Sequence, residues 1–442
     1  MQASSARPEA AEPTPAELVA ARPFLSMHAM DGLLLEGVPL AAIADTLGTP
    51  AWVYGAGTMR GRLAELTAAL APLGAHIHYA VKANDHLAVL RLMHAGGAGA
   101  DVVSAGELLR ARAAGIPGDR IVFSGVGKTA DEIRVALAEG VAQLNVESAE
   151  ELAMVSGIAA AMGRTAQVAL RINPDVDAGT HAKISTGRAE NKFGVAYDSA
   201  TALYRHAASL PGVEPVGIAL HIGSQICSLV PYRAAYARAA ALVGDIRAAG
   251  QTVGVVDCGG GLGIGYGDGP GVSVGAFAGV LRAAFGGLGV RLMVEPGRWL
   301  VGPAGVLLAS VTLAKTTGGR HFTVLDAAMN DLLRPAMYDA WHGIVPLSAV
   351  DAVAALTPTD VVGPVCETGD TFARRRLLPS LAAGACVAIL EAGAYGAVMS
   401  STYNARALAP IAMVDGARWA MIRGRQPVAS LWDGEIIPDF VT

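Results

Sequence analysis

From residue 76 onward, short apolar segments with polar ends alternate with segments of helical periodicity. Eight apolar segments precede residue 300, and they read IHYAVK, ADVVS, IVFSG, QLNVES, VALRINP, VGIALHIGS, VGVVDCGGG and RLMVEPGR. Strands that alternate with helices predict right-handed βαβ units, and eight such units close into a (β/α)₈ barrel of the TIM type. An open doubly wound sheet is the alternative, but the count of eight and the polar strand ends favour the barrel.

Each predicted strand finishes on a polar residue. These residues are Lys82, Ser104, Ser124, Glu147, Asn173, His221, Asp257 and Glu295. Active sites of such barrels lie at the carboxyl ends of the strands, so we expect these side chains to gather at one mouth. Three of the following helices begin with a capping-box pattern, at Ser104–Glu107, Thr129–Glu132 and Ser148–Glu151.

The first of these strands ends in a lysine. In HIHYAVKAND, residues 76–85, a period of two places Ile77 and Tyr79 on one face and His78 and Lys82 on the other. Lysine is almost never fully buried unless it is paired. Lys82 is therefore either a salt-bridged structural residue or a nucleophile.

The pattern changes after about residue 305, where helical periodicity gives way to strands. The predicted strands read VLLASVTLA, HFTVLDA, DVVGPVC, ACVAILEAG, RWAMIRG and QPVASL. We expect a barrel over residues 50–305 and a β-rich domain, a β-barrel or sandwich, over residues 306–442. Residues 25–49 are expected to contribute to the β domain, and the polar, alanine- and proline-rich residues 1–24 to form a flexible tail.

Composition limits the classes of function. At 442 residues, 52% hydrophobic and 16% charged, the chain is long enough for two globular domains. A net charge of −5 without a basic cluster argues against nucleic-acid binding. No apolar run reaches membrane-spanning length, and the N-terminus lacks the order of a signal peptide.

The cysteines and histidines also exclude some sites. Cys227, Cys258, Cys366 and Cys386 lie far apart without a C-x-x-C pair, and the ten histidines are scattered. This spacing indicates neither a metal site nor a disulfide framework, and it is typical of a reducing compartment. We therefore expect a soluble, cytoplasmic protein without a bound metal.

A glycine-rich run follows the seventh strand. It reads CGGGLGIGYGDG, residues 258–269, and Gly259, Gly260 and Gly261 would let backbone N–H groups approach a phosphate. Such runs are also ordinary tight turns, but phosphate sites of barrels recur in the loops after strands seven and eight. The eighth strand then ends in EPGR, residues 295–298. No GxGxxG follows the first strand, so a dinucleotide site is not expected.

A phosphate cradle together with a lysine at the same mouth suggests pyridoxal phosphate (PLP) held as a Schiff base. If Lys82 made only a structural ion pair, the glycine run and EPGR would have no common purpose.

Several motifs resemble a known family. YAVKAN, DVVSAGEL, HIGSQ, DCGGGLGIGY, EPGRWLVGPAG, NDLLRPAMYDAWH, GPVCETGD and GAYG occur in family order between about residues 30 and 405. Together they are similar to the diaminopimelate decarboxylases, which are barrel-type (fold type III) PLP enzymes. Ornithine and arginine decarboxylases are relatives, and alanine racemases are more distant.

This resemblance implies a cofactor-binding set. Its members are Lys82, Asp101, His221, Ser224, Gly259, Gly260, Gly261, Glu295, Gly297, Arg298 and Tyr395. Lys82 matches the Schiff-base lysine, His221 the imidazole stacked on the cofactor ring, and Ser224 a residue near the phosphate. On its own, His221 would be interpreted as a satisfied core residue, and Asp101 as a strand-end cap.

Glu295 matches the carboxylate that faces the pyridine nitrogen. A carboxylate there keeps the nitrogen protonated, so the ring accepts the electrons left by CO₂. The related racemases place an arginine at that nitrogen. Glu295 therefore favours decarboxylation over racemisation.

The resemblance also implies a substrate-binding set, made of Arg298, Arg334, Tyr338, Glu367 and Tyr395. The arginines match residues that bind substrate carboxylates, and Glu367 the residue that receives the distal ammonium. Cys366 matches the acid that returns a proton to the carbanion. In this family the CET motif comes from the partner subunit, which implies an obligate C₂ homodimer with shared active sites.

The loop HAKISTGRAENKFG, residues 181–194, resembles the diaminopimelate form of the active-site loop. The expected reaction is decarboxylation of meso-2,6-diaminopimelate at its D-centre to L-lysine. Two alternatives remain: a decarboxylase of ornithine, lysine, arginine or a specialised diamino acid, and a PLP-binding relative without activity. Arg334 speaks against the first, and the intact set of Lys82, His221, Glu295 and Cys366 against the second.

Overall fold

The computed structural model describes residues 12–179, 193–267, 269 and 271–441. They form two compact units. The barrel unit comprises residues 59–265 and 270–302, and the β unit comprises residues up to 58, residues 266–269 and residues from 303 onward.

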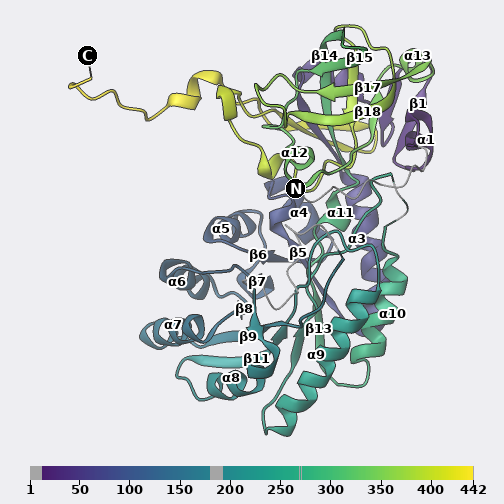
Figure 1. The fold of residues 1–442 in the computed structure, drawn as a ribbon. Coiled ribbons are helices and arrows are strands. Elements are labelled where there is room, and N and C mark those ends of the chain that lie inside the picture. The colour runs from purple at the N-terminus through teal and green to yellow at the C-terminus, as the bar shows by residue number, and fades with distance from the viewer. Residues whose placement is uncertain (1–11, 180–192, 268, 270, 442) are drawn as a thin grey trace. The chain divides into compact units, whose positions relative to one another are not determined.

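The barrel unit contains a closed ring of eight parallel strands (Figure 1). Its strands are β5 (His76–Ala80), β6 (Gly99–Val102), β7 (Ile121–Phe123), β8 (Gln143–Val146), β9 (Ala166–Asn173), β11 (Val213–Ala219), β12 (Val255–Asp257) and β13 (Arg291–Val294). Pairing of β8 with β9 and of β13 with β5 closes the ring. All eight predicted barrel strands are therefore confirmed, and a short strand β10 (Val195–Ala196) adds to β9 outside the ring.

Helices surround this ring. They are α3 (Ala56–Leu70), α4 (Leu87–Ala95), α5 (Ala105–Ala113), α6 (Ala130–Glu139), α7 (Ala149–Ala161), α8 (Ala200–Ala207), α9 (Val230–Ala248), α10 (Val274–Phe285) and the single turn α11 (Arg298–Val301). In Figure 1, α5, α6, α7 and α8 follow one another along the outer side of the strands.

Only one of the three predicted capping boxes is complete. At α6, the Thr129 side chain accepts from the amide of Glu132, and the Glu132 carboxylate accepts from the amide of Thr129. Ser104 and Ser148 also accept from the amides three residues later and so cap α5 and α7. The carboxylates of Glu107 and Glu151, however, accept from the amides of Val103 and Glu147, one residue before each cap. These two amides directly follow strands β6 and β8.

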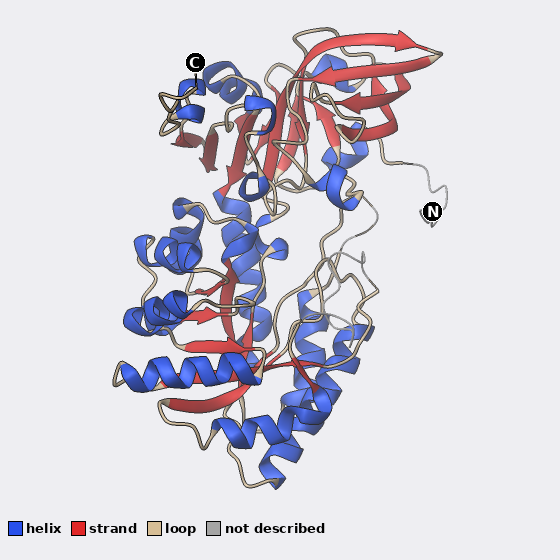
Figure 2. Ribbon diagram, turned by 60° about the vertical axis from the view of Figure 1, so that its left-hand side comes forward, coloured by secondary structure: helices blue, strands red, loops and turns tan. Residues whose placement is uncertain are grey.

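The β unit is built around a sheet of mixed direction (Figure 2). Its strands are β4 (Ala51–Gly55), β14 (Gly305–Thr317), β15 (Arg320–Leu325), β16 (Ile344–Pro346), β17 (Leu356–Val362), β18 (Thr371–Pro379), β19 (Cys386–Ile389), β20 (Ile411–Asp415) and β21 (Arg418–Arg423), with short helices α12 (Arg334–Tyr338) and α13 (Ala349–Ala352). β4 pairs with β14 and β20, so residues 51–55 belong to this sheet although we expected them in the barrel domain.

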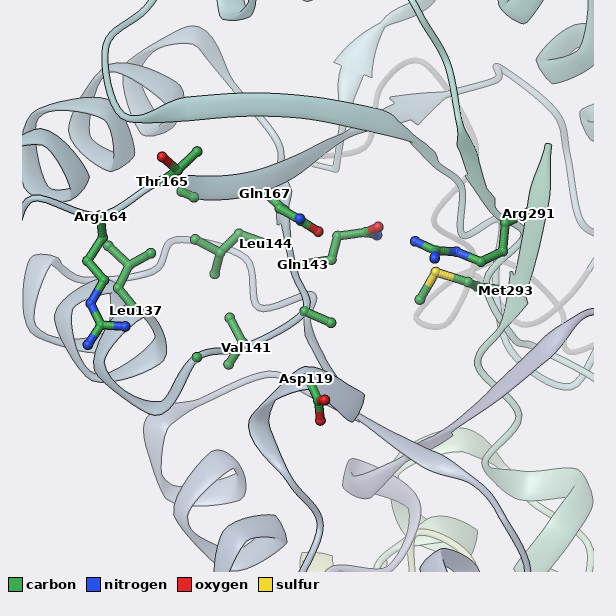
Figure 3. A pocket seen from close by; sticks show the side chains of 13 residues that line it. Asp119, Leu137, Val141, Gln143, Leu144, Arg164, Thr165, Gln167, Arg291 and Met293 are labelled. Atoms are coloured by element: carbon green, nitrogen blue, oxygen red, sulfur yellow. The ribbon is translucent and has the colours of Figure 1, made fainter.

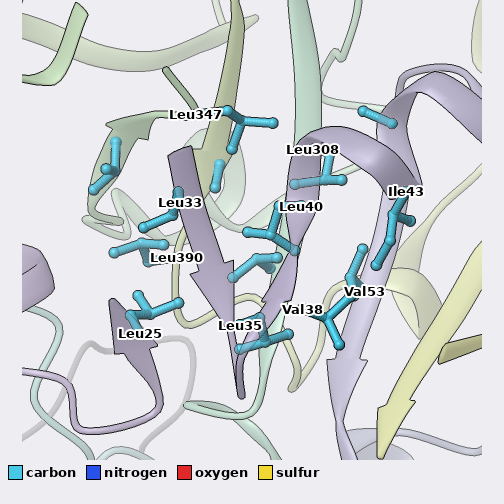
Figure 4. Packing of buried hydrophobic residues seen from close by; sticks show 14 of the residues in the cluster. Leu25, Leu33, Leu35, Val38, Leu40, Ile43, Val53, Leu308, Leu347 and Leu390 are labelled. Carbon is cyan, nitrogen blue, oxygen red and sulfur yellow. The ribbon is translucent and has the colours of Figure 1, made fainter. Parts of the chain in front are cut away.

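The N-terminal segment forms a small sheet of its own within the β unit. β1 (Leu25–His28), β2 (Gly32–Leu35) and β3 (Val38–Pro39) pair in order, followed by α2 (Leu40–Leu47). Figure 4 shows Leu33 and Leu35 of β2 facing Leu308 and Leu347 in one buried cluster. Residues 25–49 therefore pack on the main sheet rather than extending it.

Part of the expected flexible tail is folded. Residues Pro15–Ala20 form α1, capped by Thr14, and Leu18 is buried in the same cluster. Arg22 makes a buried ion pair with Glu391. The proline- and alanine-rich composition suggested a flexible segment. Leu18 and Arg22 nevertheless have partners in the β unit, which fold it.

One predicted strand is wrong. QPVASL, residues 426–431, contributes to a 3₁₀ helix over Val428–Trp432, where Pro427 starts the turn. Within the described residues, no helix has the length and apolarity needed to cross a membrane, and no group of three or more potential metal ligands occurs.

Candidate active site

The carboxyl ends of the barrel strands bring Lys82 and Asp101 together. β5 ends at Ala80, and Lys82 lies in a one-turn 3₁₀ helix that follows it directly. Its Nζ lies 2.7 Å from Oδ2 of Asp101, which is fully buried on β6. The ion pair holds the lysine amine at the strand ends. This geometry agrees both with a salt-bridged structural lysine and with a nucleophile that faces the barrel mouth.

Lys82 borders a cavity of about 250 Å³ in the barrel unit. His221 and Glu295 line the same cavity, as do Ser124 and Asn145. An amine, an imidazole and a carboxylate thus line one cavity at the strand ends.

His221 follows β11 and accepts a hydrogen bond at Nδ1 from the amide of Gly260, at 3.4 Å. Burial, together with the positive charges of Arg171 and Lys82, holds the pKa of His221 well below its usual range. The imidazole is therefore neutral at physiological pH. A neutral ring can lie against an aromatic cation without repelling it.

Glu295 lies at the end of β13 and is 6% exposed. Burial raises the pKa of its carboxyl well above the usual range, and the nearby carboxylates of Asp101 and Asp257 raise it further, while Lys82 lowers it. The Ser124 hydroxyl donates to Oε1 of Glu295 at 3.0 Å. A buried carboxyl among two other carboxylates is a site that favours a cationic ligand atom.

The glycine run is shaped by close backbone contacts. A Cβ on Gly259 would lie 2.1 Å from the carbonyl oxygen of Leu220, and Gly259 and Gly261 have φ of +66° and +91°. The amide of Gly259 donates to Asp257 and that of Gly260 to His221. Because these two amides have protein partners, phosphate binding by the run stays a prediction.

Arg298 and Ser224 supply further anion-binding groups beside this run. Nη2 of Arg298 donates to the Ser224 hydroxyl at 3.0 Å, and Arg298 is 7% exposed. Arg298 opens the short helix α11, after Gly297. A Cβ on Gly297 would lie 2.9 Å from that of Ala83, so glycine lets this turn approach the Lys82 segment.

These residues fit PLP by their chemistry. The cavity offers a lysine amine for the aldehyde, a buried carboxyl for the ring nitrogen and a neutral imidazole for the ring face. Arg298 and Ser224 provide a guanidinium and a hydroxyl for a phosphate.

The predicted substrate loop lies largely outside the described residues. Its return is fixed, because the amide of Gly194 donates to Glu147, whose carboxylate also pairs with Arg171 at 2.5 Å. The Arg171 guanidinium lies 5.0 Å from the centre of the Phe193 ring. Of the loop 181–194, on which the predicted specificity depends, residues 181–192 lie outside the described residues.

Arg334, Tyr338 and Tyr395 are three of the five predicted site residues that occur in the β unit. Arg334 begins α12, is 5% exposed and bonds Nε2 of His342 at 2.7 Å. His342 in turn bonds the carbonyl of Leu390 through Nδ1, so Nε2 accepts from the arginine. Tyr338 ends α12, and Tyr395 adopts a left-handed backbone with φ of +54°. Arg334 is held in one orientation, as a carboxylate-binding guanidinium requires.

Cys366 and Glu367 lie on an exposed turn of the β unit. Asp370 anchors this turn by accepting from the amides of Val365 and Met329, each at 2.7 Å. The Tyr403 hydroxyl donates to Glu367 at 2.5 Å. The CET motif is therefore presented on the surface of the β unit on a turn with a fixed backbone.

Comparison with known proteins decides the family. Residues 57–302 match the family described as "Pyridoxal-dependent decarboxylase, pyridoxal binding domain". A diaminopimelate decarboxylase from Zymomonas mobilis is 47% identical over 408 residues, which are 91% of this chain and 96% of that protein. The chain belongs to the diaminopimelate decarboxylase family.

Solved structures of diaminopimelate decarboxylases agree with this membership. One from Helicobacter pylori, complexed with L-lysine, has a TM-score of 0.86 at 38% identity and covers 89% of this chain and 98% of that one. One from M. jannaschii, in complex with L-lysine, has a TM-score of 0.90 at 32% identity and covers 95% and 99%. The predicted fold, a barrel with a β-rich domain, is confirmed.

Sequence reasoning missed the residues that support Glu295 in this decarboxylase fold. Ser124 and Asp257 were identified only as polar strand ends, and Asn145 was not singled out. A signal was present, because Gln143 and Asn145 occupy one face of the buried strand β8, and Glu147 follows that strand directly. Polar residues on the inner face of a barrel strand indicate a hydrogen-bond network inside the barrel.

Proposed function

We propose that this protein decarboxylates meso-2,6-diaminopimelate to L-lysine and CO₂ with PLP on Lys82. The observation that carries the proposal is the cavity shared by Lys82, His221 and Glu295 inside a domain that matches the pyridoxal-binding family. When bound, PLP withdraws electrons from the substrate carbon that loses CO₂.

The barrel side chains have separate tasks in this proposal. Asp101 orients the Lys82 amine through the 2.7 Å ion pair and stabilises it while it is charged. Glu295 would face the ring nitrogen of bound PLP and stabilise its positive charge. His221, which is neutral, would pack against the ring and exclude water from that face.

The substrate carries an amine and a carboxylate at both ends, so recognition needs cations and an anion. Arg334, fixed by His342, is proposed to bind one carboxylate in the bidentate geometry of guanidinium. Glu367 is proposed to receive the distal ammonium, and Cys366 to return a proton after CO₂ leaves. A decarboxylase acting on ornithine or lysine forms a diamine, and its substrate would have no second carboxylate for Arg334.

We also propose that the enzyme is a C₂ homodimer in which each site takes Cys366 and Glu367 from the partner. Both residues are exposed in a single chain, although the proposed chemistry requires them at the cofactor. Large apolar side chains are also exposed toward the C-terminus, at Met421, Val428, Trp432, Ile436, Ile437 and Phe440. Such a concentration of apolar surface is typical of an interface.

Subunit mixing tests the shared site. Lys82→Ala and Cys366→Ala proteins, each nearly inactive, are mixed under conditions of subunit exchange. Random exchange makes half of the dimers mixed, each with one intact site of two, so about a quarter of wild-type activity returns. No recovery after exchange has been verified by mass spectrometry would contradict a shared site.

A substrate panel tests the reaction itself. The purified chain with added PLP is given meso-diaminopimelate, L,L-diaminopimelate, L-lysine, L-ornithine and L-arginine, and CO₂ and chiral products are measured. We expect meso-diaminopimelate to be turned over far faster than the others, with L-lysine as product. A preference for ornithine or lysine would replace the proposed substrate and leave the decarboxylase chemistry in place.

A further inference from the structure

A second cavity, of about 360 Å³, lies at the amino ends of the barrel strands, opposite the carboxyl ends where Lys82 is held. Gln143, Ala166 and Arg291 line it, and each is the first residue of its strand, β8, β9 or β13. None of the described residues that we assign to cofactor or substrate lines this cavity. The proposed reaction therefore makes no use of it.

The orientation of the Gln143 amide follows from its hydrogen bonds. Nδ2 of Asn145 donates to Asp257 at 3.1 Å and to the Ser124 hydroxyl at 2.8 Å, which leaves Oδ1 of Asn145 as an acceptor. Nε2 of Gln143 donates to that oxygen at 2.7 Å. The other atom of the amide, Oε1, has no hydrogen-bond donor among the described residues, although Gln143 is only 3% exposed. A buried amide oxygen without a donor favours a ligand that supplies one.

A guanidinium faces this amide. Figure 3 shows the side chain of Arg291 pointing toward that of Gln143, with Gln167 beside them. Within the part of the chain that the structure describes, the Arg291 guanidinium makes no hydrogen bond or ion pair. A guanidinium offers N–H groups in one plane and binds a carboxylate through two parallel hydrogen bonds. The cavity therefore presents a carboxylate-binding group opposite an acceptor.

The charges of the region favour an anion with a neutral donor. Of the described residues that line the cavity, Arg164 and Arg291 are cations and Asp119 is the one carboxylate, which points away from Arg291 in Figure 3. Burial lowers the pKa of His76, and the positive charges of Arg291 and Arg120 lower it further. An ammonium group in the ligand would meet the same repulsion. A hydroxyl therefore suits the amide oxygen better than an ammonium does.

We propose that this cavity binds a small 2-hydroxycarboxylate. The carboxylate of the ligand accepts from Arg291, and its 2-hydroxyl donates to Oε1 of Gln143. The aliphatic part of the ligand packs toward Val141 and Leu144, which line the same cavity. Recognition at this site involves no cofactor, so it is independent of the proposed decarboxylation.

Probes with the same three-carbon skeleton test the recognition. L-Lactate, propionate and L-alanine are titrated into the PLP-loaded full chain, and their dissociation constants are measured by ligand-observed NMR. We expect L-lactate to bind in the millimolar range and at least about tenfold more tightly than propionate, which gives the amide oxygen no donor. L-Alanine should bind this site more weakly than L-lactate. An affinity for L-lactate that is no higher than that for either other probe would overturn the assignment.

Two variants locate the binding. Arg291→Met should weaken L-lactate binding at least about tenfold, because charge-assisted hydrogen bonds to the carboxylate are lost. Arg205→Met is the matched control, since Arg205 is an exposed arginine of α8 that does not line the cavity, and it should bind L-lactate as wild type does. Circular dichroism checks that both variants are folded. Because an amino acid can also react with the cofactor, only the L-alanine binding that Arg291→Met removes is compared. Unchanged L-lactate binding in Arg291→Met, or an equal loss in Arg205→Met, would contradict the site.

One hydrogen bond connects this cavity with the cofactor cavity. Gln143 donates to Asn145, and Asn145 lines the cavity that Lys82 borders. Since hydrogen bonds that share an amide polarise one another, a donor at Oε1 strengthens the bond to Asn145. Saturating L-lactate should therefore tighten PLP binding by about fivefold, and PLP should tighten L-lactate binding by the same factor. This consequence, unlike the site itself, rests on the proposed cofactor. Unchanged affinities in both directions would overturn the connection, whereas L-lactate binding that Arg291→Met abolishes would still support the site.

Discussion

Replacing Glu295 with glutamine removes the charge that we propose faces the ring nitrogen, and it keeps the shape of the side chain. Ser124 can still donate to the amide oxygen, so the packing around position 295 is retained. Glu295 is 6% exposed and sits among the barrel strands, where breaking a buried charge pair costs about 3–5 kcal/mol. At 1.36 kcal/mol for each factor of ten, kcat should fall roughly 200- to 5,000-fold.

The assay is CO₂ release from meso-diaminopimelate at saturating PLP, with KM measured alongside. We expect KM to change little, because the proposed substrate-binding residues remain. Glu139→Gln is the control: it makes the same change at an exposed carboxylate that pairs with Arg112, and its activity should equal that of wild type. A Glu295→Gln enzyme with PLP fully bound and kcat within tenfold of wild type would refute the role given to this carboxylate.

Three further predictions concern stability and assembly. Arg22→Met leaves the buried Glu391 without its cation and should lower the free energy of unfolding, measured in urea, by about 3 kcal/mol. Arg134→Met breaks an exposed ion pair and should change this free energy little. Equal effects would contradict a folded N-terminal segment. Burial raises the pKa of Glu107 to about 7 from an ordinary 4.5, so wild-type stability falls as pH rises through that interval. Glu107→Gln should therefore gain stability relative to wild type between pH 5 and pH 8 in urea titrations, and a constant difference would show that the group is not perturbed. Truncation before Val428 removes the exposed apolar C-terminal side chains and should raise the dimer dissociation constant in sedimentation equilibrium, and an unchanged constant would place the interface elsewhere.

Hydrophobic periodicity predicted the barrel well because each strand is short, apolar and closed by a polar residue. It did not predict the pairing of β4 (Ala51–Gly55). This strand precedes the barrel in sequence but pairs with β14 and β20, which lie about 250 or more residues later in the chain. Only long-range pairing decides that assignment. The 3₁₀ helix at Val428–Trp432 was missed because its residues also fit a short strand.

The candidate site could be predicted only as far as single residues carry a signal. Lys82, His221 and Glu295 end strands and match family motifs, so the sequence identified them. Asn145 lies inside a strand, and its role depends on hydrogen bonds to residues from two other strands. Those contacts follow from the barrel closing, which no local pattern encodes.

Reductive trapping tests the covalent chemistry most directly. The holoenzyme is treated with borohydride, digested and mapped by mass spectrometry. A phosphopyridoxyl group on Lys82, and its loss in Lys82→Ala, is the result expected from the ion pair with Asp101 and the cavity shared with Glu295. A label on a different lysine, or none in a protein that is folded and supplied with PLP, would contradict the assignment of Lys82 as the cofactor-binding residue.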